Sequence, residues 1–178
     1  MNIYKYDKDY NYEIIKIQDI EKIKSLSKDY IYYEKIGDIV KPYFDIDIYD
    51  APLSNTLLKY EKYYTTLFKL IFPNGDIAIS SSHKPKVKIS FHFIINNYKY
   101  KLNELDDFIQ KHPILSMDDN IDKTIYKDRP PHYKVNFLGH NKIVLRLIYS
   151  HKSHNEKRLK TSCNYHNDLS KHIVSHLI

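Results

Sequence analysis

Glycine is scarce in this sequence. Gly37, Gly75 and Gly139 are the three glycines among 178 residues. A Walker phosphate-binding loop and the GxGxxG dinucleotide fingerprint both need clustered glycines, so neither motif can be written anywhere in the chain. If the protein binds phosphates, side chains and metal ions must hold them.

Cysteine and long apolar runs are also nearly absent. The single cysteine, Cys163, excludes an internal disulfide framework and favours a reducing compartment. The N-terminus lacks an apolar signal core, and apolar runs such as FHFII are far shorter than the roughly 20 residues that span a bilayer. We therefore expect a soluble, intracellular protein with no membrane partner.

The excess of one charge sign is small. The chain has 28 Lys and Arg residues against 22 Asp and Glu, and the formal charge of +6 only mildly favours a polyanionic partner. The 18 tyrosines carry little weight, because AT-rich coding alone can produce a profile rich in Lys, Ile, Tyr and Asn. The length suits one domain with a real core, so residues 1–178 are expected to form a single domain.

The periodicity of apolar residues predicts an α+β protein. The expected order is a helix near residues 19–28, a strand over 40–48, a helix ending at Pro73, two paired strands at DIAISSS and KVKISFHFII, a helix capped by Asn103, a short extended run at NIDKTIY, a late strand at KIVLRLIYS and a terminal helix from about Asn167. This order predicts helices packed on one face of a largely antiparallel sheet, with the other face free for chemistry.

The segment KPYFDIDIY carries two carboxylates on one side. In an extended chain, Phe44 and Ile46 face one way while Asp45 and Asp47 face the other. Same-face residues on a strand lie about 6.5–7 Å apart, so the two carboxylates can share one or two cations. Oxygen ligands on a rigid element favour Mg²⁺ or Mn²⁺ over zinc. The alternative is a half-exposed strand whose outward positions merely happen to be acidic.

Polar side chains also line one side of KVKISFHFII. Lys88, Ser90 and His92 alternate with the apolar residues of this run, so they form a row on one face of the expected strand. A cation, a hydroxyl and an imidazole at successive spacings can each donate to the anionic oxygens of a triphosphate. The other interpretation is an ordinary amphipathic strand with a polar solvent face.

A third aspartate and a basic run complete the candidates. Asp122, in NIDKTIY, could reach the same metal from a neighbouring strand, although Asp118 and Asp119 compete for this role and such a residue is often a surface aspartate or a cap. In LRLIYSHKSHNEKR, Arg146 is flanked by apolar residues, so its guanidinium needs an anionic partner or an escape to solvent. That partner can be a structural carboxylate or a phosphate. The further basic residues of the run that we single out are Lys152 and Arg158.

A zinc site is not expected. Cys163, His166, His172 and His176 have the spacing C-x2-H-x5-H-x3-H, and four such ligands can hold zinc. The spacing matches no standard finger, however, and His172 and His176 are also i and i+4 on the expected terminal helix.

Four motifs, taken in order, resemble those of the archaeo-eukaryotic primase superfamily. The likeness is greatest to the branch of large DNA virus primases and eukaryotic primase-polymerases, and it runs from about residue 41 to residue 152. The family's D-x-D strand is matched by Asp45 and Asp47, its S-x-H strand after a lysine by Lys88, Ser90 and His92, its hydrophobic-Asp motif by Ile121, Asp122 and Tyr126, and its R…S.K run by Arg146, Ser150 and Lys152.

The resemblance implies both a fold and an activity. The fold would be the primase core, in which a mostly antiparallel sheet unit related to the RNA-recognition fold (76–178) joins an N-terminal αβ unit (1–75). The activity would be template-directed nucleotidyl transfer on single-stranded DNA from nucleoside triphosphates, with a helicase or other replication protein as a further partner. Asp45, Asp47 and Asp122 would hold two Mg²⁺ or Mn²⁺ ions, Lys88, Ser90, His92 and Arg146 would grip the phosphates, and Lys152 and Arg158 would contact phosphates or template.

Two other functions stay open from the sequence. Three carboxylates and a histidine also serve a metal-dependent nuclease or phosphodiesterase. A non-catalytic nucleic-acid-binding module would use basic and tyrosine-rich surfaces for phosphate contacts and stacking, but it gains nothing from carboxylates in its groove.

Overall fold

The computed structural model of the chain describes residues 1–9, 11–49, 53–84, 87–127, 144–152, 161–162 and 168–175. Over these residues the strands are β1 (Asn2–Tyr6), β2 (Tyr12–Lys16), β3 (Ile31–Lys35), β4 (Ile39–Val40), β5 (Tyr43–Tyr49), β6 (Asp76–Ser81), β7 (Lys88–Asn96), β8 (Tyr100–Lys101), β9 (Val144–Arg146) and β10 (Thr161–Ser162). The helices are α1 (Leu53–Ile71), α2 (Leu102–Lys111) and the 3₁₀ helices η1 (Ile20–Ser25), η2 (Lys123–Tyr126) and η3 (Leu169–His172). All pairs of these strands are antiparallel, so the predicted α+β class with mostly antiparallel sheet is confirmed.

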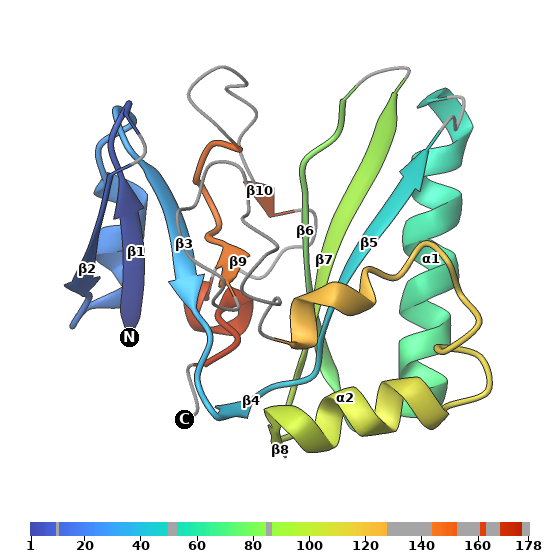
Figure 1. Ribbon diagram of the computed structural model, residues 1–178. Helices are drawn as coiled ribbons and strands as arrows, with labels where there is room; N and C mark the ends of the chain where they lie inside the picture. The colour runs from blue at the N-terminus through green and yellow to red at the C-terminus, as the bar shows by residue number, and fades with distance from the viewer. Residues whose placement is uncertain are drawn as a thin grey trace.

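The strands of the described residues form two four-stranded sheets. The first has the order β2-β1-β3-β9 and the second the order β10-β6-β7-β5, while β4 and β8 form a separate pair. Figure 1 shows the two sheets side by side, with η3 lying between them. Because β5 pairs with β7, chain segments on both sides of residue 75 share the second sheet, and the expected units 1–75 and 76–178 do not coincide with the sheets.

The main core lies between α1 and one face of the second sheet. Phe44 of β5 and Phe93 of β7 are direct neighbours on that face. Phe68 of α1 stacks on Phe44 with ring centroids 4.2 Å apart and meets Phe93 edge-on at 5.2 Å. All three rings are fully buried, and each such burial stabilises the fold by about 1.5–3 kcal/mol. This packing makes β5 and β7 a rigid platform for whatever their second face carries.

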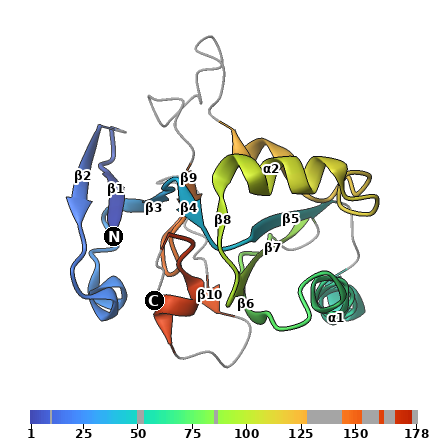
Figure 2. The ribbon, with the colours of Figure 1, turned by 90° about the horizontal axis from the view of Figure 1, so that it is seen from below.

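The second face of this sheet is also covered in part. Figure 2 shows α1 and α2 on opposite sides of the second sheet. On the α2 side, Tyr43 of β5 packs against Tyr126 of η2 with ring centroids 5.1 Å apart, and the Tyr126 hydroxyl donates to the Tyr43 carbonyl at 2.5 Å. The prediction that helices would cover only one face is therefore wrong. The reason is that Tyr43 and its cross-strand neighbour Ile94 are large side chains that need burial at this end of the face.

Several predicted helices begin or end differently in the structure. The helices expected near 19–28 and after Asn167 are the short η1 and η3, and NIDKTIY forms one bridge at Ile121 before η2. Each 3₁₀ helix begins after an aspartate whose carboxylate accepts the N–H two residues on, at Asp19, Asp122 and Asp168. This local bond favours a tight turn over a longer α-helix. Helix α2 begins at Leu102 after Lys101, so Asn103 lies inside its first turn rather than at the cap.

Among the described residues, no helix is both long enough and apolar enough to cross a bilayer.

Candidate active site on the second sheet

Two rows of polar residues cross the second sheet on the face opposite α1. The antiparallel register sets Asp45 of β5 directly beside His92 of β7, and Asp47 directly beside Ser90. Directly opposed residues on neighbouring strands point to the same face, so the acidic pair and the Ser-His pair predicted from the sequence share one surface. The two rows lie side by side on adjacent strands.

Asp47 is held by a lysine of the neighbouring strand. Lys88 Nζ donates to Asp47 Oδ2, and the lysine ammonium also lies 5.2 Å from the centroid of the Tyr49 ring. The other carboxylate oxygen, Oδ1 of Asp47, is buried and has no hydrogen-bond partner among the described residues. A buried carboxylate oxygen that lacks a donor costs free energy, and a cation at that position removes the cost.

Asp45 contacts the imidazole. His92 Nε2 lies 3.5 Å from Asp45 Oδ1, and the histidine side chain is 6% exposed against 20% for the aspartate. His92 therefore does not point into the apolar core beneath the sheet, since its partner is a carboxylate of the polar face. Two carboxylates about 6 Å apart, such as Asp45 and Asp47, repel each other by roughly 3 kcal/mol at an effective dielectric constant near 20. Positive groups on this face reduce that repulsion.

Asp122 lies on the free edge of β5. Its backbone N–H donates to the Asp45 carbonyl at 2.9 Å, and the Asp47 N–H donates to the Asn120 carbonyl at 2.8 Å. The residue between them, Ile121, is bridged to Ile46 of β5. The segment thus runs alongside β5 with Asp122 next to Asp45, so the three aspartates predicted to converge do lie on adjacent segments.

Tyr126 lies near these carboxylates. Burial raises the pKa of the Tyr126 hydroxyl well above its usual value, and the neighbouring Tyr43, Asp45, Asp122 and Asp106 raise it further. Asp45 and Asp122 therefore act electrostatically on the same buried hydroxyl.

The Asp122 carboxylate is already engaged. Its Oδ1 accepts from the N–H of Thr124 at 2.9 Å and from the Thr124 hydroxyl at 2.6 Å, which starts η2. Within the described residues, no group of three or more His, Cys, Asp or Glu side chains is arranged to hold a metal ion. The donor set still suits a hard divalent ion, because it consists of oxygen ligands and includes the buried Oδ1 of Asp47. A metal ion on Asp122 Oδ1 would compete with the hydrogen bonds from Thr124, and one on Asp47 Oδ2 would compete with Lys88.

The structure distinguishes Asp122 from its competitors. Asp118 Oδ2 accepts from the Tyr64 hydroxyl at 2.9 Å, and its Oδ1 accepts from the Asn120 N–H at 2.9 Å. Asp118 therefore shapes the loop that precedes Asp122. Asp119 is exposed to solvent.

Two serines of β6 and its extension belong to the same face and were not predicted. Ser80 is the cross-strand partner of His92, and the Ser82 N–H donates to the Ser90 carbonyl at 3.0 Å, which continues the register by two residues. Ser82 is 3% exposed, and its Oγ has no hydrogen-bond partner among the described residues. The sequence DIAISSS contained a pattern that could have predicted these two serines. When this run pairs with KVKISFHFII, alternate serines lie beside the Ser-His row.

The basic residues lie elsewhere. Arg146 is on β9 in the first sheet, opposite Tyr33, and the Tyr33 hydroxyl donates to the Lys152 carbonyl at 3.2 Å. The buried Ser150 hydroxyl accepts from the Tyr32 N–H at 2.7 Å. The R…S.K run therefore docks on β3, in a different sheet from the carboxylates.

The remaining predictions fall outside the described residues. These are the nucleic-acid contact of Arg158 and three of the four zinc candidates, Cys163, His166 and His176. His172 is described and is 5% exposed in η3.

Comparison with known proteins adds no assignment. No protein-family model matches the chain, and no curated protein sequence matches it.

Proposed function

We propose that the protein is a template-directed nucleotidyltransferase of the primase or primase-polymerase kind, acting on single-stranded DNA with two divalent ions. The observation that carries the proposal is the register of β5 on β7, which sets Asp45 beside His92 and Asp47 beside Ser90. Asp122 lies next to them, since its N–H donates a hydrogen bond to the Asp45 carbonyl. An acidic edge next to a row of phosphate-binding donors is what nucleotidyl transfer needs.

The residues divide into two groups. Ser90 and His92, with Ser82 beside them, would donate to the oxygens of the incoming triphosphate. Asp45, Asp47 and Asp122 would hold the Mg²⁺ or Mn²⁺ ions, which when bound neutralise charge on the triphosphate and lower the pKa of the attacking hydroxyl.

The reaction is a substitution at the α-phosphorus. The attacking hydroxyl oxygen forms a bond to the α-phosphorus while the bond from that phosphorus to the oxygen bridging to the β-phosphate breaks. Pyrophosphate leaves, and the hydroxyl proton passes to solvent. Lys88 pairs with Asp47 on the same face, and its ammonium would contact a phosphate oxygen of the triphosphate.

Primer synthesis on a single-stranded DNA template, with nucleoside triphosphates and Mn²⁺ or Mg²⁺, tests the proposal. Wild-type protein is expected to extend labelled product, and the double variant Asp45→Ala with Asp47→Ala is expected to make none. Asp122→Asn should also be inactive. The matched control is Asp119→Asn, since Asp119 is an exposed aspartate of the same loop and its change should leave synthesis intact.

Two results would assign a different function. Shortening of the labelled strand in the absence of nucleotides would identify a nuclease or phosphodiesterase. Strand binding with no synthesis, indifferent both to divalent metal and to Asp45→Ala, would identify a binding module.

A further inference from the structure

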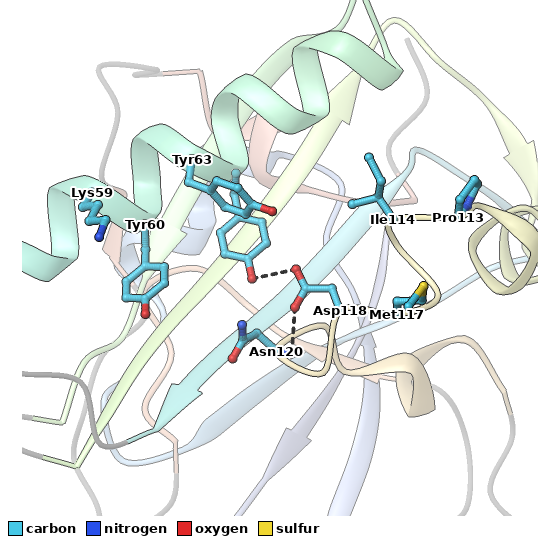
Figure 3. Close-up of a pocket in the computed structure, with 9 residues that line it drawn as sticks. Lys59, Tyr60, Tyr63, Pro113, Ile114, Met117, Asp118 and Asn120 are labelled. Carbon is cyan, nitrogen blue, oxygen red and sulfur yellow. Dashed lines mark hydrogen bonds between the residues drawn. The ribbon is translucent and has the colours of Figure 1, made fainter.

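A hollow lies near the edge of β5, outside the polar face that carries Asp45 and His92. It is an open groove with a volume of about 540 Å³, bordered by α1 on one side and residues 113–120 on the other. Figure 3 shows Lys59 and Tyr60 at one end of this pocket and Pro113, Ile114 and Met117 at the other. This volume is in the range of small-molecule binding sites.

The walls of the pocket leave large apolar side chains in contact with solvent. Tyr63 is 51% exposed, Ile114 is 49% exposed and Met117 is 81% exposed. Single exposed apolar residues are common and need no explanation, but three around one hollow indicate a surface that binds something flat and apolar.

The base of the pocket is rigid. Asp118 accepts from the buried Tyr64 hydroxyl at 2.9 Å and from the Asn120 N–H at 2.9 Å, and the Lys123 ammonium donates to the Asp118 carbonyl at 2.8 Å. A ligand entering this site therefore meets a preformed wall, which reduces the conformational entropy lost on binding.

The pocket is joined to the acidic strand. Asn120 lines the pocket, and its carbonyl accepts the Asp47 N–H at 2.8 Å. Two residues further, the Asp122 N–H donates to the Asp45 carbonyl. A ligand in the pocket therefore lies just across the edge of β5 from the carboxylates.

The chemistry of the walls selects the ligand. Both oxygens of the Asp118 carboxylate already accept hydrogen bonds, whereas Lys59 has no acidic partner among the described residues. The pocket has aromatic walls, an amide at its base and an ammonium at one end. These groups suit a ligand with an uncharged planar ring and a phosphate group attached to it.

We propose that this pocket binds one base of a single-stranded nucleic acid, stacked on Tyr63, with the neighbouring phosphate at Lys59. The inference rests on the proposed function, because that function makes a single-stranded nucleic acid the ligand. It goes beyond that function, because it assigns the strand a contact outside the polar face.

The pocket assignment is tested by measuring the binding of a fluorescein-labelled, twelve-nucleotide oligo(dT) by fluorescence anisotropy, at fixed low salt and in EDTA. Stacking on an aromatic side chain contributes about 1–3 kcal/mol per base, so Tyr63→Ala is expected to raise Kd by roughly 5- to 150-fold. Tyr63→Phe, which keeps the ring, should bind within about twofold of wild type. The control is Leu70→Ala, at a position that is 75% exposed on the same helix and does not line the pocket.

A second variant guards against misfolding of the first. Met117 is 81% exposed, so Met117→Glu should fold normally, and its new negative charge at the pocket should weaken the strand's binding. A Kd equal to that of wild type in either Tyr63→Ala or Met117→Glu would overturn the pocket assignment.

The same assay separates this inference from the proposed function. It contains neither metal nor nucleoside triphosphate, so it measures strand binding without catalysis. If wild-type protein binds no strand at all, both proposals fail. If it binds and Tyr63→Ala binds equally, only the pocket fails. Equilibrium dialysis with dTMP distinguishes a strand from a free nucleotide as the ligand of the pocket. If Tyr63→Ala weakens the binding of dTMP but leaves the binding of the oligonucleotide unchanged, the pocket does not bind a strand.

Discussion

At the scale of single residues, Ser82 gives a sharp test of the phosphate-binding face. Its buried hydroxyl lies beside Ser90 and has no partner among the described residues. Ser82→Ala should raise the Kd for a nucleoside triphosphate with Mn²⁺ by roughly 10- to 150-fold, because a hydrogen bond to a charged group contributes about 1.5–3 kcal/mol. Isothermal titration calorimetry measures this change.

The neighbouring serine is a matched control for that experiment. Ser81 is equally buried but is paired with Phe91, on the apolar face of the same strand. Ser81→Ala should leave nucleotide affinity within about twofold of wild type. Equal weakening by both changes would mean that the serines act through the fold rather than through the phosphate.

Lys88 gives a second prediction at this scale, in which the substitution raises an affinity instead of lowering it. Because its ammonium occupies Asp47 Oδ2, it competes with any cation for that carboxylate. Lys88→Met should therefore raise the affinity for Mn²⁺ in the absence of nucleotide by roughly fivefold, as expected for an ion pair of about 1 kcal/mol. Titration of free Mn²⁺ by electron paramagnetic resonance measures this, with Lys111→Met on α2, 75% exposed, as the control. Unchanged Mn²⁺ affinity in Lys88→Met would contradict competition at Asp47.

At the scale of elements, the turn from α1 into β6 depends on Gly75. A Cβ added there would lie 2.5 Å from Cγ2 of the buried Ile95 and 3.0 Å from the Phe72 carbonyl oxygen. The methyl group belongs to a packed strand and cannot move away cheaply, so Gly75→Ala should lower the free energy of unfolding by about 1–3 kcal/mol. Urea denaturation measures the difference.

Gly37 is the control for this prediction. The nearest atom to a Cβ at Gly37 is Ser175 Oγ, at 4.0 Å, so Gly37→Ala should change the free energy of unfolding by less than about 1 kcal/mol. Equal stability of the two variants would show that β7 yields more readily than its packing indicates.

The elements also show what the sequence could and could not predict. Alternation in FDIDI and KISFHF predicted the two strands and which residues share a face, because a strand's side-chain period of two is local. The pairing of Arg146 with Tyr33 has no local signal, since more than a hundred residues separate the partners, and so the first sheet was not foreseen. The 3₁₀ helices η1 and η3 were predicted as longer helices, because an aspartate that caps a 3₁₀ turn gives the same sequence signal as one that caps an α-helix.

At the scale of the whole molecule, a C-terminal segment holds the two sheets together. Glu34 of β3 accepts from the N–H groups of Val174 at 3.0 Å and Ser175 at 2.6 Å, so the segment is tied to the first sheet. Near the second sheet, Lys41 Nζ donates to the Ser170 carbonyl at 2.7 Å, and Lys171 pairs with Asp76 of β6 at 3.1 Å. The segment around η3 is therefore anchored on both sides by buried or half-buried charged groups.

This arrangement makes stability depend on pH through Lys41. Burial lowers the pKa of the Lys41 ammonium to about 8, although the charge of Glu34 acts in the opposite direction. In the unfolded chain a lysine titrates near its usual pKa of about 10.4. Between these two values the unfolded state holds a proton that the folded state has lost, so the free energy of unfolding should rise with pH in this window. The rise should be up to about 3 kcal/mol, since each pKa unit corresponds to about 1.4 kcal/mol.

The buried tyrosines set the upper limit of that window. Burial raises the pKa of Tyr43 and Tyr126, so above about pH 10 the unfolded chain loses protons that the folded protein keeps, and stability should fall. Urea denaturation followed by far-UV circular dichroism from pH 7 to 11 should therefore give a maximum near pH 10. Lys41→Met removes the rising arm and keeps the falling one, because it leaves the tyrosines unchanged. Parallel curves for wild type and Lys41→Met between pH 8 and 10 would show that Lys41 keeps its proton where it lies between the sheets.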